Sequence, residues 1–200
     1  MLRRLFFTAI ILGVIALPAS AQETRRVRGT VEKIEGPVLT IKTLDGSDLP
    51  VKVTGDNPVY TALVKADLAD IKPGAYVGVT SLAQPDGTLK AVAIHFFPEG
   101  ARGVGEGQRR WDQQPQSLMT NATVDTVVSG VDGLVITVKY RDGEKKVVVS
   151  PQTPIVRMVP GSAADVKAGT KIIIFLATNP GTGWETQRVT YGKDGLTPPM

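Results

Sequence analysis

The feature that most constrains this chain is an internal repeat. The pentapeptide Asp70-Ile71-Lys72-Pro73-Gly74 recurs ninety-five positions later as Asp165-Val166-Lys167-Ala168-Gly169. In both places an apolar run follows, at residues 76–82 and 172–177. We expect each pentapeptide to end a short helical segment and to begin a strand, because glycine adopts the backbone conformations that such a turn requires. The chain is therefore predicted to hold two copies of one small domain.

Short runs that alternate apolar and polar residues surround both turns, a pattern typical of half-buried strands. The Asp-Gly pairs at 45–46 and 142–143 occupy matching places in the two copies and favour hairpin turns. Apolar residues within 61–69 have the spacing of a short amphipathic helix. The predicted strands are 27–34, 38–43, 49–53, 76–82 and 89–97 in the first copy, and 122–128, 134–140, 147–149, 172–177 and 184–191 in the second.

This order predicts an all-β protein of two tandem five-stranded OB-like barrels, each with a short helix between strands three and four. An SH3-like or split-barrel arrangement has the same number of strands and stays open. The predicted domains are residues 22–97 and 121–200. Residues 98–120 are rich in Gly, Gln and Arg and have no hydrophobic period, which predicts a linker.

The first twenty-one residues have the pattern of a signal peptide. Arg3 and Arg4 precede the apolar run 5–17, and Ala19-Ser20-Ala21 fits a cleavage site. The run is shorter than the roughly 20 residues that span a membrane, although an uncleaved anchor stays an alternative. We expect a periplasmic or secreted protein with no membrane span after cleavage. Loss of the two arginines lowers the formal charge from +4 to +2, which gives little reason to expect nucleic-acid binding.

Three stretches carry a family resemblance: the strand start Gly29-Thr30-Val31, the turn Lys72-Pro73-Gly74, and the linker Gly105-Glu106-Gly107-Gln108-Arg109-Arg110-Trp111-Asp112 with the following residues 119–124. Over the whole mature length, the chain resembles the uncharacterised exported β-barrel repeat proteins of Gram-negative bacteria. The linker is similar to a stretch of small alphaproteobacterial secreted proteins. The resemblance implies an OB-like fold and a periplasmic location, and it implies no particular activity.

The sequence offers little catalytic chemistry. His95 is the only histidine and cysteine is absent, so a zinc site with two imidazoles cannot form within one chain. No serine lies in a nucleophile-elbow context, and no lysine–serine pair follows the glycines of 103–107 as it would in a phosphate-binding loop. We therefore expect no metal, no cofactor and no enzymatic activity. A small carbohydrate-active or other hydrolase that uses two carboxylates stays an alternative.

The linker supplies the first candidate binding residues. Trp111 could stack on a sugar or base while Arg109 and Arg110 hold anionic groups. Alternatively, the tryptophan fills a groove between the two barrels and fixes their relative position.

A basic strand face of the second barrel supplies the other candidates, Lys139, Arg141 and Lys146. These residues could bind an anionic ligand, or they could form a solvated face that discourages edge pairing. By analogy with OB barrels, Lys42 and Lys52 of the first barrel are added to this surface.

Together these observations predict an exported, periplasmic, non-enzymatic binding or scaffolding protein. Its ligand or partner would be an anionic polymer, a saccharide or an envelope protein. An envelope structural protein is a further alternative, and the oligomeric state stays open.

Overall fold

The protein is all-β in a computed structural model that describes residues 24–131, 133–179 and 183–200. The predicted signal peptide, Asp132 of one predicted turn, and Pro180-Gly181 of another lie outside the described residues. Four single 3₁₀ turns accompany the strands: η1 (Leu68–Asp70), η2 (Glu99–Ala101), η3 (Ala163–Asp165) and η4 (Lys193–Gly195). The strands are β1 (Thr24–Glu35), β2 (Val38–Thr43), β3 (Asp48–Val53), β4 (Val59–Lys65), β5 (Tyr76–Ala83), β6 (Leu89–Phe96), β7 (Gly107–Arg110), β8 (Leu118–Gly130), β9 (Gly133–Tyr140), β10 (Gly143–Val149), β11 (Ile155–Pro160), β12 (Lys171–Asn179), β13 (Gly183–Thr186) and β14 (Arg188–Gly192).

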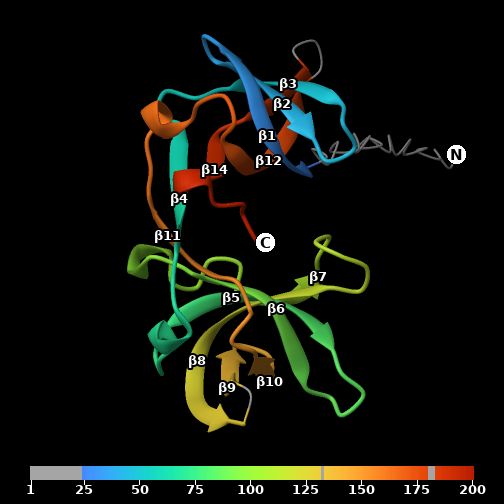
Figure 1. The fold of residues 1–200 in the computed structure, drawn as a ribbon, viewed down its shortest axis with the longest axis vertical. Coiled ribbons are helices and arrows are strands. Elements are labelled where there is room, and N and C mark those ends of the chain that lie inside the picture. The colour runs from blue at the N-terminus through green and yellow to red at the C-terminus, as the bar shows by residue number, and fades with distance from the viewer. Residues whose placement is uncertain (1–23, 132, 180–182) are drawn as a thin grey trace, which may run out of the picture.

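The strand pairings close two rings. In the first ring, which is uppermost in Figure 1, the order is β1–β2–β3–β13–β12, and β12 pairs back with β1. In the second ring the order is β5–β6–β10–β9–β8, and β8 pairs back with β5. Each ring has one parallel pair, which joins strands of the two repeats: β3 with β13 in the first ring and β10 with β6 in the second. The remaining pairs of both rings are antiparallel. The two repeats therefore build rings with the same plan.

Each ring takes strands from both repeats, which differs from the expected tandem arrangement. The first ring joins β1, β2 and β3 of the first repeat to β12 and β13 of the second. The second ring joins β8, β9 and β10 of the second repeat to β5 and β6 of the first. The two repeats thus exchange their last strands. Each of the two predicted domains, 22–97 and 121–200, contributes strands to both rings.

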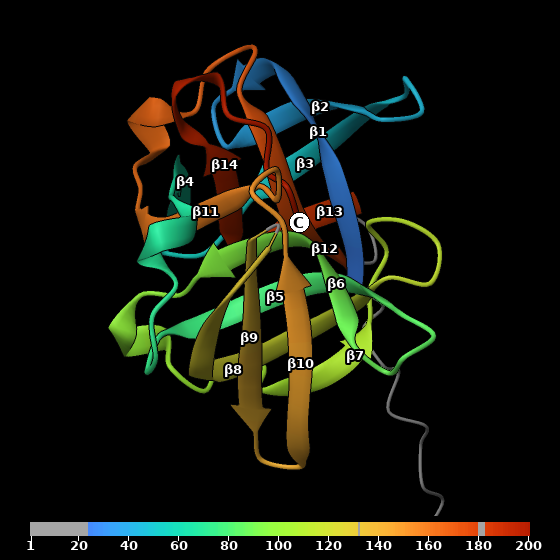
Figure 2. The same cartoon turned by 60° about the horizontal axis from the view of Figure 1, so that its bottom comes forward.

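Two extended strands, β4 and β11, carry the chain from one ring to the other (Figures 1 and 2). They run antiparallel, with Ala62 opposite Val159 and Leu63 opposite Met158. On its other side β4 pairs in parallel with β14, and β11 pairs in parallel with β6. A seven-residue strand covers about 23 Å at the usual rise per residue, so it can cross between rings where a helix of the same length could not.

The predicted helix at 61–69 is corrected by the structure. Most of this range lies in β4, and the rest includes only the single turn η1. Val59, Tyr60 and Val64 favour a strand, and β4 is hydrogen-bonded on both sides, which outweighs a weak helical pattern.

The repeated pentapeptides do follow single 3₁₀ turns and precede strands, as expected. Their glycines, Gly74 and Gly169, have φ values of 87° and 89°, the left-handed conformation that favours glycine.

The core has three parts. One buried cluster fills each ring, with Ile41 and Ile174 in the first and Ile94 and Ile136 in the second. These residues occupy the apolar positions of the alternating pattern. A third, smaller cluster lies between the rings and contains Leu63, Met119, Val156 and Met200. Among the described residues, no helix is long and apolar enough to cross a membrane.

The predicted linker, 98–120, is partly regular. It contains η2 and β7, and β8 already begins at Leu118. β7 pairs antiparallel with β8, from Gly107 opposite Asn121 to Arg110 opposite Leu118. The predicted last strand, 184–191, is in turn interrupted and forms β13 and β14. The linker therefore adds a strand beside the second ring.

The strand exchange can be tested with cysteine pairs, since the chain has no cysteine of its own. In the structure Thr30 lies opposite Lys171, and the equivalent of Thr30 in the other ring, Thr123, lies opposite Tyr76. Directly opposed positions in antiparallel strands are close enough for a disulfide after small adjustments. We expect oxidation to link Thr30→Cys with Lys171→Cys inside one monomer, and to leave the matched pair Thr123→Cys and Lys171→Cys unlinked. Tandem barrels would give the reverse result by mass spectrometry of non-reduced peptides.

Candidate functional site

A cavity of about 540 Å³ lies between the two rings. The crossing strands β4 and β11 contribute its middle, including Thr61 and Met158. The second ring contributes His95 and Asn121, and the segment between β7 and β8 contributes Trp111. Further lining residues are Val59, Tyr60, Phe97, Pro98, Ala101, Val104, Gly105, Arg109, Met119, Val159, Pro160, Ile173, Phe175, Arg188, Thr190 and Met200. The volume is in the range of about 300–1,000 Å³ that is typical of small-molecule sites.

The cavity is mostly apolar and has few charged groups. Its charged side chains are Arg109 and Arg188, and none of its described lining residues is Asp or Glu. Within the described part of the chain, no group of three or more His, Asp or Glu side chains could hold a metal ion. The cavity therefore offers apolar surface, two cations and a few polar atoms.

His95 and Asn121 meet above Gly78 in this wall. His95 lies on β6 directly opposite Gly78 of β5, and Asn121 of β8 lies opposite the same glycine on its other side. A Cβ atom at position 78 would lie 2.2 Å from His95 Nε2 and 2.9 Å from Asn121 Oδ1. Glycine at this position therefore makes room for both side chains.

Two polar atoms in this wall are buried without a hydrogen-bond partner among the described residues: Asn121 Oδ1 and Trp111 Nε1. Asn121 is 3% exposed, and its Nδ2 donates to the carbonyl of Val104 at 3.1 Å, which orients the amide. Buried polar atoms are nearly always paired in folded proteins, because leaving one unpaired costs about 1–3 kcal/mol. One acceptor and one donor on residues that line the cavity thus have no partner within the described part of the chain.

His95 is neutral at ordinary pH. Burial, together with the smaller effect of the nearby charge of Arg109, lowers the pKa of its imidazole to about 3. The ring packs edge-on against Phe97, with 4.8 Å between centroids. A neutral imidazole has one donor and one acceptor nitrogen, so it can serve as a polar contact without attracting a counter-ion.

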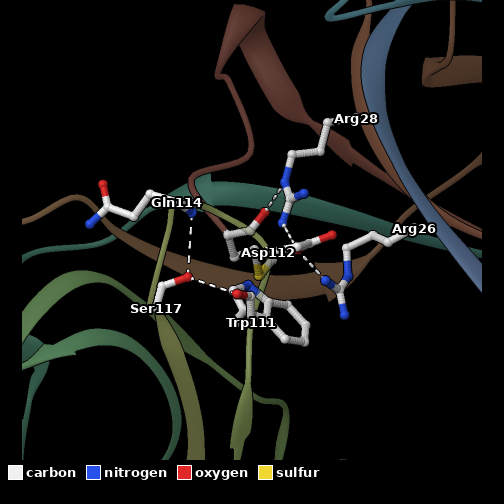
Figure 3. A network of polar contacts seen from close by, with 7 residues as sticks. Arg26, Arg28, Trp111, Asp112, Gln114 and Ser117 are labelled. Carbon is white, nitrogen blue, oxygen red and sulfur yellow. Dashed lines mark hydrogen bonds and ion pairs between the residues drawn. The ribbon is translucent and has the colours of Figure 1, made fainter.

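Trp111 and Asp112 connect β7 to the first ring (Figure 3). The Asp112 carboxylate forms ion pairs with Arg26 and, at 2.9 Å, with Arg28, both from β1. The guanidinium carbon of Arg26 lies 3.4 Å from the centroid of the Trp111 ring, a cation–π contact. Ser117 donates to the Trp111 carbonyl at 3.0 Å, which holds the turn around them. The segment after β7 is thereby attached to both rings.

Asp112 with Arg26 and Arg28 forms a clamp between the segment after β7 and the first ring. The ionisation of these groups follows from their surroundings. Burial alone would raise the pKa of the Asp112 carboxyl, but the hydrogen bonds and charges of Arg28 and Arg26 hold it below its usual value. Burial lowers the pKa of the Arg26 guanidinium, and Asp112 opposes that shift. The Arg28 Nε also donates to the backbone oxygen of Met200 at 2.8 Å, which fixes the last residue of the chain in the wall.

The structure brings two of the predicted site residues together, Trp111 and Arg109, with 5.4 Å between the guanidinium carbon and the ring centroid. Arg110 follows Arg109 on β7, is exposed, and does not line the cavity. Trp111 packs against the small cluster between the rings, which agrees with the alternative that it fills a groove there.

The predicted basic surface is divided between the two rings. Lys139, Arg141 and Lys146 are exposed at the β9–β10 end of the second ring, and Lys139 pairs with Asp125 at 3.1 Å. Lys42 and Lys52 lie on β2 and β3 in the first ring. Figure 1 shows these two strand pairs at opposite ends of the molecule. The lysines are therefore not gathered into one site.

Sequence reasoning missed most of the cavity wall. Met158 and Phe175 carried no motif, and Asn121 had no role assigned although it lies in the stretch 119–124; each is brought to the cavity by a different strand. A partial signal existed at Phe175, because a large apolar residue on the outward face of a strand is often covered by something. The sequence marks His95 only as a lone histidine, which cannot form a zinc site with two imidazoles.

No family model, curated protein or solved structure matches this chain. The resemblance to exported β-barrel repeat proteins consequently stays a prediction, and the site must be interpreted from its own geometry.

Substitution of Gly78 tests the packing of this wall. Gly78→Ala would force a methyl group into His95, and overpacking of this kind costs about 1–3 kcal/mol of unfolding free energy. Gly100→Ala is the matched control, because nothing lies within 4 Å of its Cβ and its φ is ordinary. Urea unfolding should show a clear loss for the first variant and little change for the second. Equal stabilities would contradict the described packing.

The buried histidine predicts a pH dependence. Between about pH 6.5 and pH 3 the unfolded chain binds a proton at His95 and the folded chain does not, so stability falls as the pH falls through this window. We expect the unfolding free energy to drop by about 1 kcal/mol from pH 6 to pH 5 on this account. His95→Leu, which cannot titrate, should lose this slope. Parallel stability curves for the two proteins over that interval would contradict a neutral buried imidazole.

Proposed function

We propose that this protein is a non-enzymatic binding protein that holds a small molecule in the cavity between its two rings. The observation that carries the proposal is a mostly apolar cavity of about 540 Å³ with two residues in its wall, Asn121 and Trp111, that each have a buried polar atom without a partner among the described residues. Few convergent polar groups in an apolar concave surface are typical of ligand sites.

The lining chemistry favours binding over hydrolysis. A carboxylate hydrolase needs two acidic side chains that face one cleft, and the described lining has none. Asp112 is close by, but its oxygens are engaged by Arg26 and Arg28. His95, with its lowered pKa, has no carboxylate or nucleophile paired with it among the described hydrogen bonds and ion pairs, so it is a poor general base near neutral pH.

The cellular location and the fold family are parts of the same proposal. The signal-like residues 1–21 support export to the periplasm, where a protein without cysteine depends on packing and hydrogen bonds alone. A three-strand meander closed by two further strands supports an OB-like description of each ring, with strands contributed by both repeats. We regard the protein as a periplasmic small-molecule carrier or sensor rather than a scaffold.

A neutral fluorescent probe, N-phenyl-1-naphthylamine, tests the proposal. We expect the probe to bind with increased, blue-shifted emission. Val59→Trp should reduce the affinity at least about tenfold, because Val59 is half-exposed at the cavity and a larger side chain there fills the entrance. Val148→Trp is the matched control: Val148 is also exposed but lies on β10 away from the cavity. Absence of probe binding, or an equal loss in both variants, would refute the proposed site.

A further inference from the structure

The apolar part of the cavity is adapted to a flexible molecule. Met119, Met158 and Met200, all the methionines in the described part of the chain, belong to its wall; Met158 is partly exposed, and Met119 and Met200 are buried. Methionine is unbranched and polarisable, so its side chain adjusts to irregular or mobile partners. Such a wall suits an alkyl chain better than a rigid planar ring system.

The apolar surface continues outward from the cavity. Val59, Val104 and Phe175 line it, yet they are 49%, 54% and 49% exposed. Large apolar side chains that gather at the edge of one cavity mark a surface that another apolar group covers. An alkyl chain that runs from the interior past this edge would remove all three from water.

Arg109 supplies an unused cationic group at the polar end. Its Nη1 donates to the carbonyl of Gly105 at 2.8 Å, and no other hydrogen bond or ion pair of its side chain occurs among the described residues. By contrast, Arg26 and Arg28 share Asp112, and Arg102 is paired with Glu99. A guanidinium has five N–H donors in a planar fork that matches a carboxylate. Four of these donors are free to bind a ligand.

The surroundings of Arg109 favour an anion. No described side chain of the lining is acidic, Arg28 holds the backbone oxygen of Met200 at 2.8 Å, and the unpartnered Trp111 Nε1 is a second donor near the guanidinium of Arg109. Asn121 Oδ1 is an acceptor, so a water or hydroxyl group would lie between it and an anionic head. Charge complementarity thus selects an anionic head over a cationic or a neutral one.

We infer that the ligand is an alkyl carboxylate, with its chain along the methionine-lined wall and its carboxylate on Arg109. The inference rests on the proposed function, because it names the ligand class of the same cavity. A sulfate ester of an alkyl chain has the same head-group charge and is a comparison in the test.

Displacement of N-phenyl-1-naphthylamine by decanoate, decanol, decyl sulfate and decyltrimethylammonium, all below their micelle concentrations, tests the inference. We expect decanoate to bind at least about tenfold more tightly than decanol, since a hydrogen bond to a charged group contributes more than a neutral one. Arg109→Gln should remove this preference, so that decanoate and decanol displace the probe equally well. Arg25→Gln, at an exposed β1 position that does not line the cavity, is the control and should behave as the parent protein.

The outcomes separate the two proposals. If the probe binds but decanoate displaces it no better than decanol, the ligand class is wrong and the cavity remains a binding site. Tighter binding of decyl sulfate than of decanoate would overturn the carboxylate assignment, and preference for the ammonium compound would overturn the anionic one. Equal losses in Arg109→Gln and Arg25→Gln would remove Arg109 from the site. If the probe itself fails to bind, the proposed function is wrong, and the ligand class that rests on it is wrong as well.

Discussion

The antiparallel pairing of β4 with β11 is the constraint on which the rest of the structure depends. Both strands leave one ring and enter the other, so each ring must be completed by strands of the other repeat. β4 is also paired in parallel with β14, which pairs with β12 of the first ring, and β11 is paired in parallel with β6 of the second ring, so backbone hydrogen bonds tie both crossing strands to the barrels. The rings are therefore held by main-chain pairing and by the clamp of Asp112 on Arg26 and Arg28.

The cavity follows from this exchange. Neither repeat could form it alone, because its wall combines β6 and β8 of the second ring, β12 of the first ring with its neighbour β14, and both crossing strands. Both sides bring polar and apolar groups to the space: His95 and Met119 line it from the second ring, and Phe175 of β12 and Arg188 of β14 line it on the side of the first.

The local sequence pattern predicted the positions of the strands well. It predicted the pairing between the strands poorly. Alternation of apolar residues located Val38–Thr43 as observed, and the Lys-Pro-Gly turn marked where β5 begins. The exchange of strands could not be predicted from the sequence, because equivalent strands of the two repeats have the same pattern of apolar faces. Only the extended conformation of 59–65 decides which of them pair. For the site, Trp111 and Arg109 stood out as an aromatic and a cation in a polar segment. Asn121 and Met158 did not, because their significance comes from burial opposite another ring.

Methionine methyl resonances offer the most direct measurement of the central claim that the space between exchanged rings binds a ligand. The three cavity methionines come from β8, β11 and the chain end, so their methyl groups report on the wall from separate elements. In protein labelled at these methyl groups, titration with N-phenyl-1-naphthylamine should shift the signals of Met119, Met158 and Met200 with one common saturation curve. Signals that stay unchanged while the probe binds would show that the ligand lies elsewhere, and the account would be wrong.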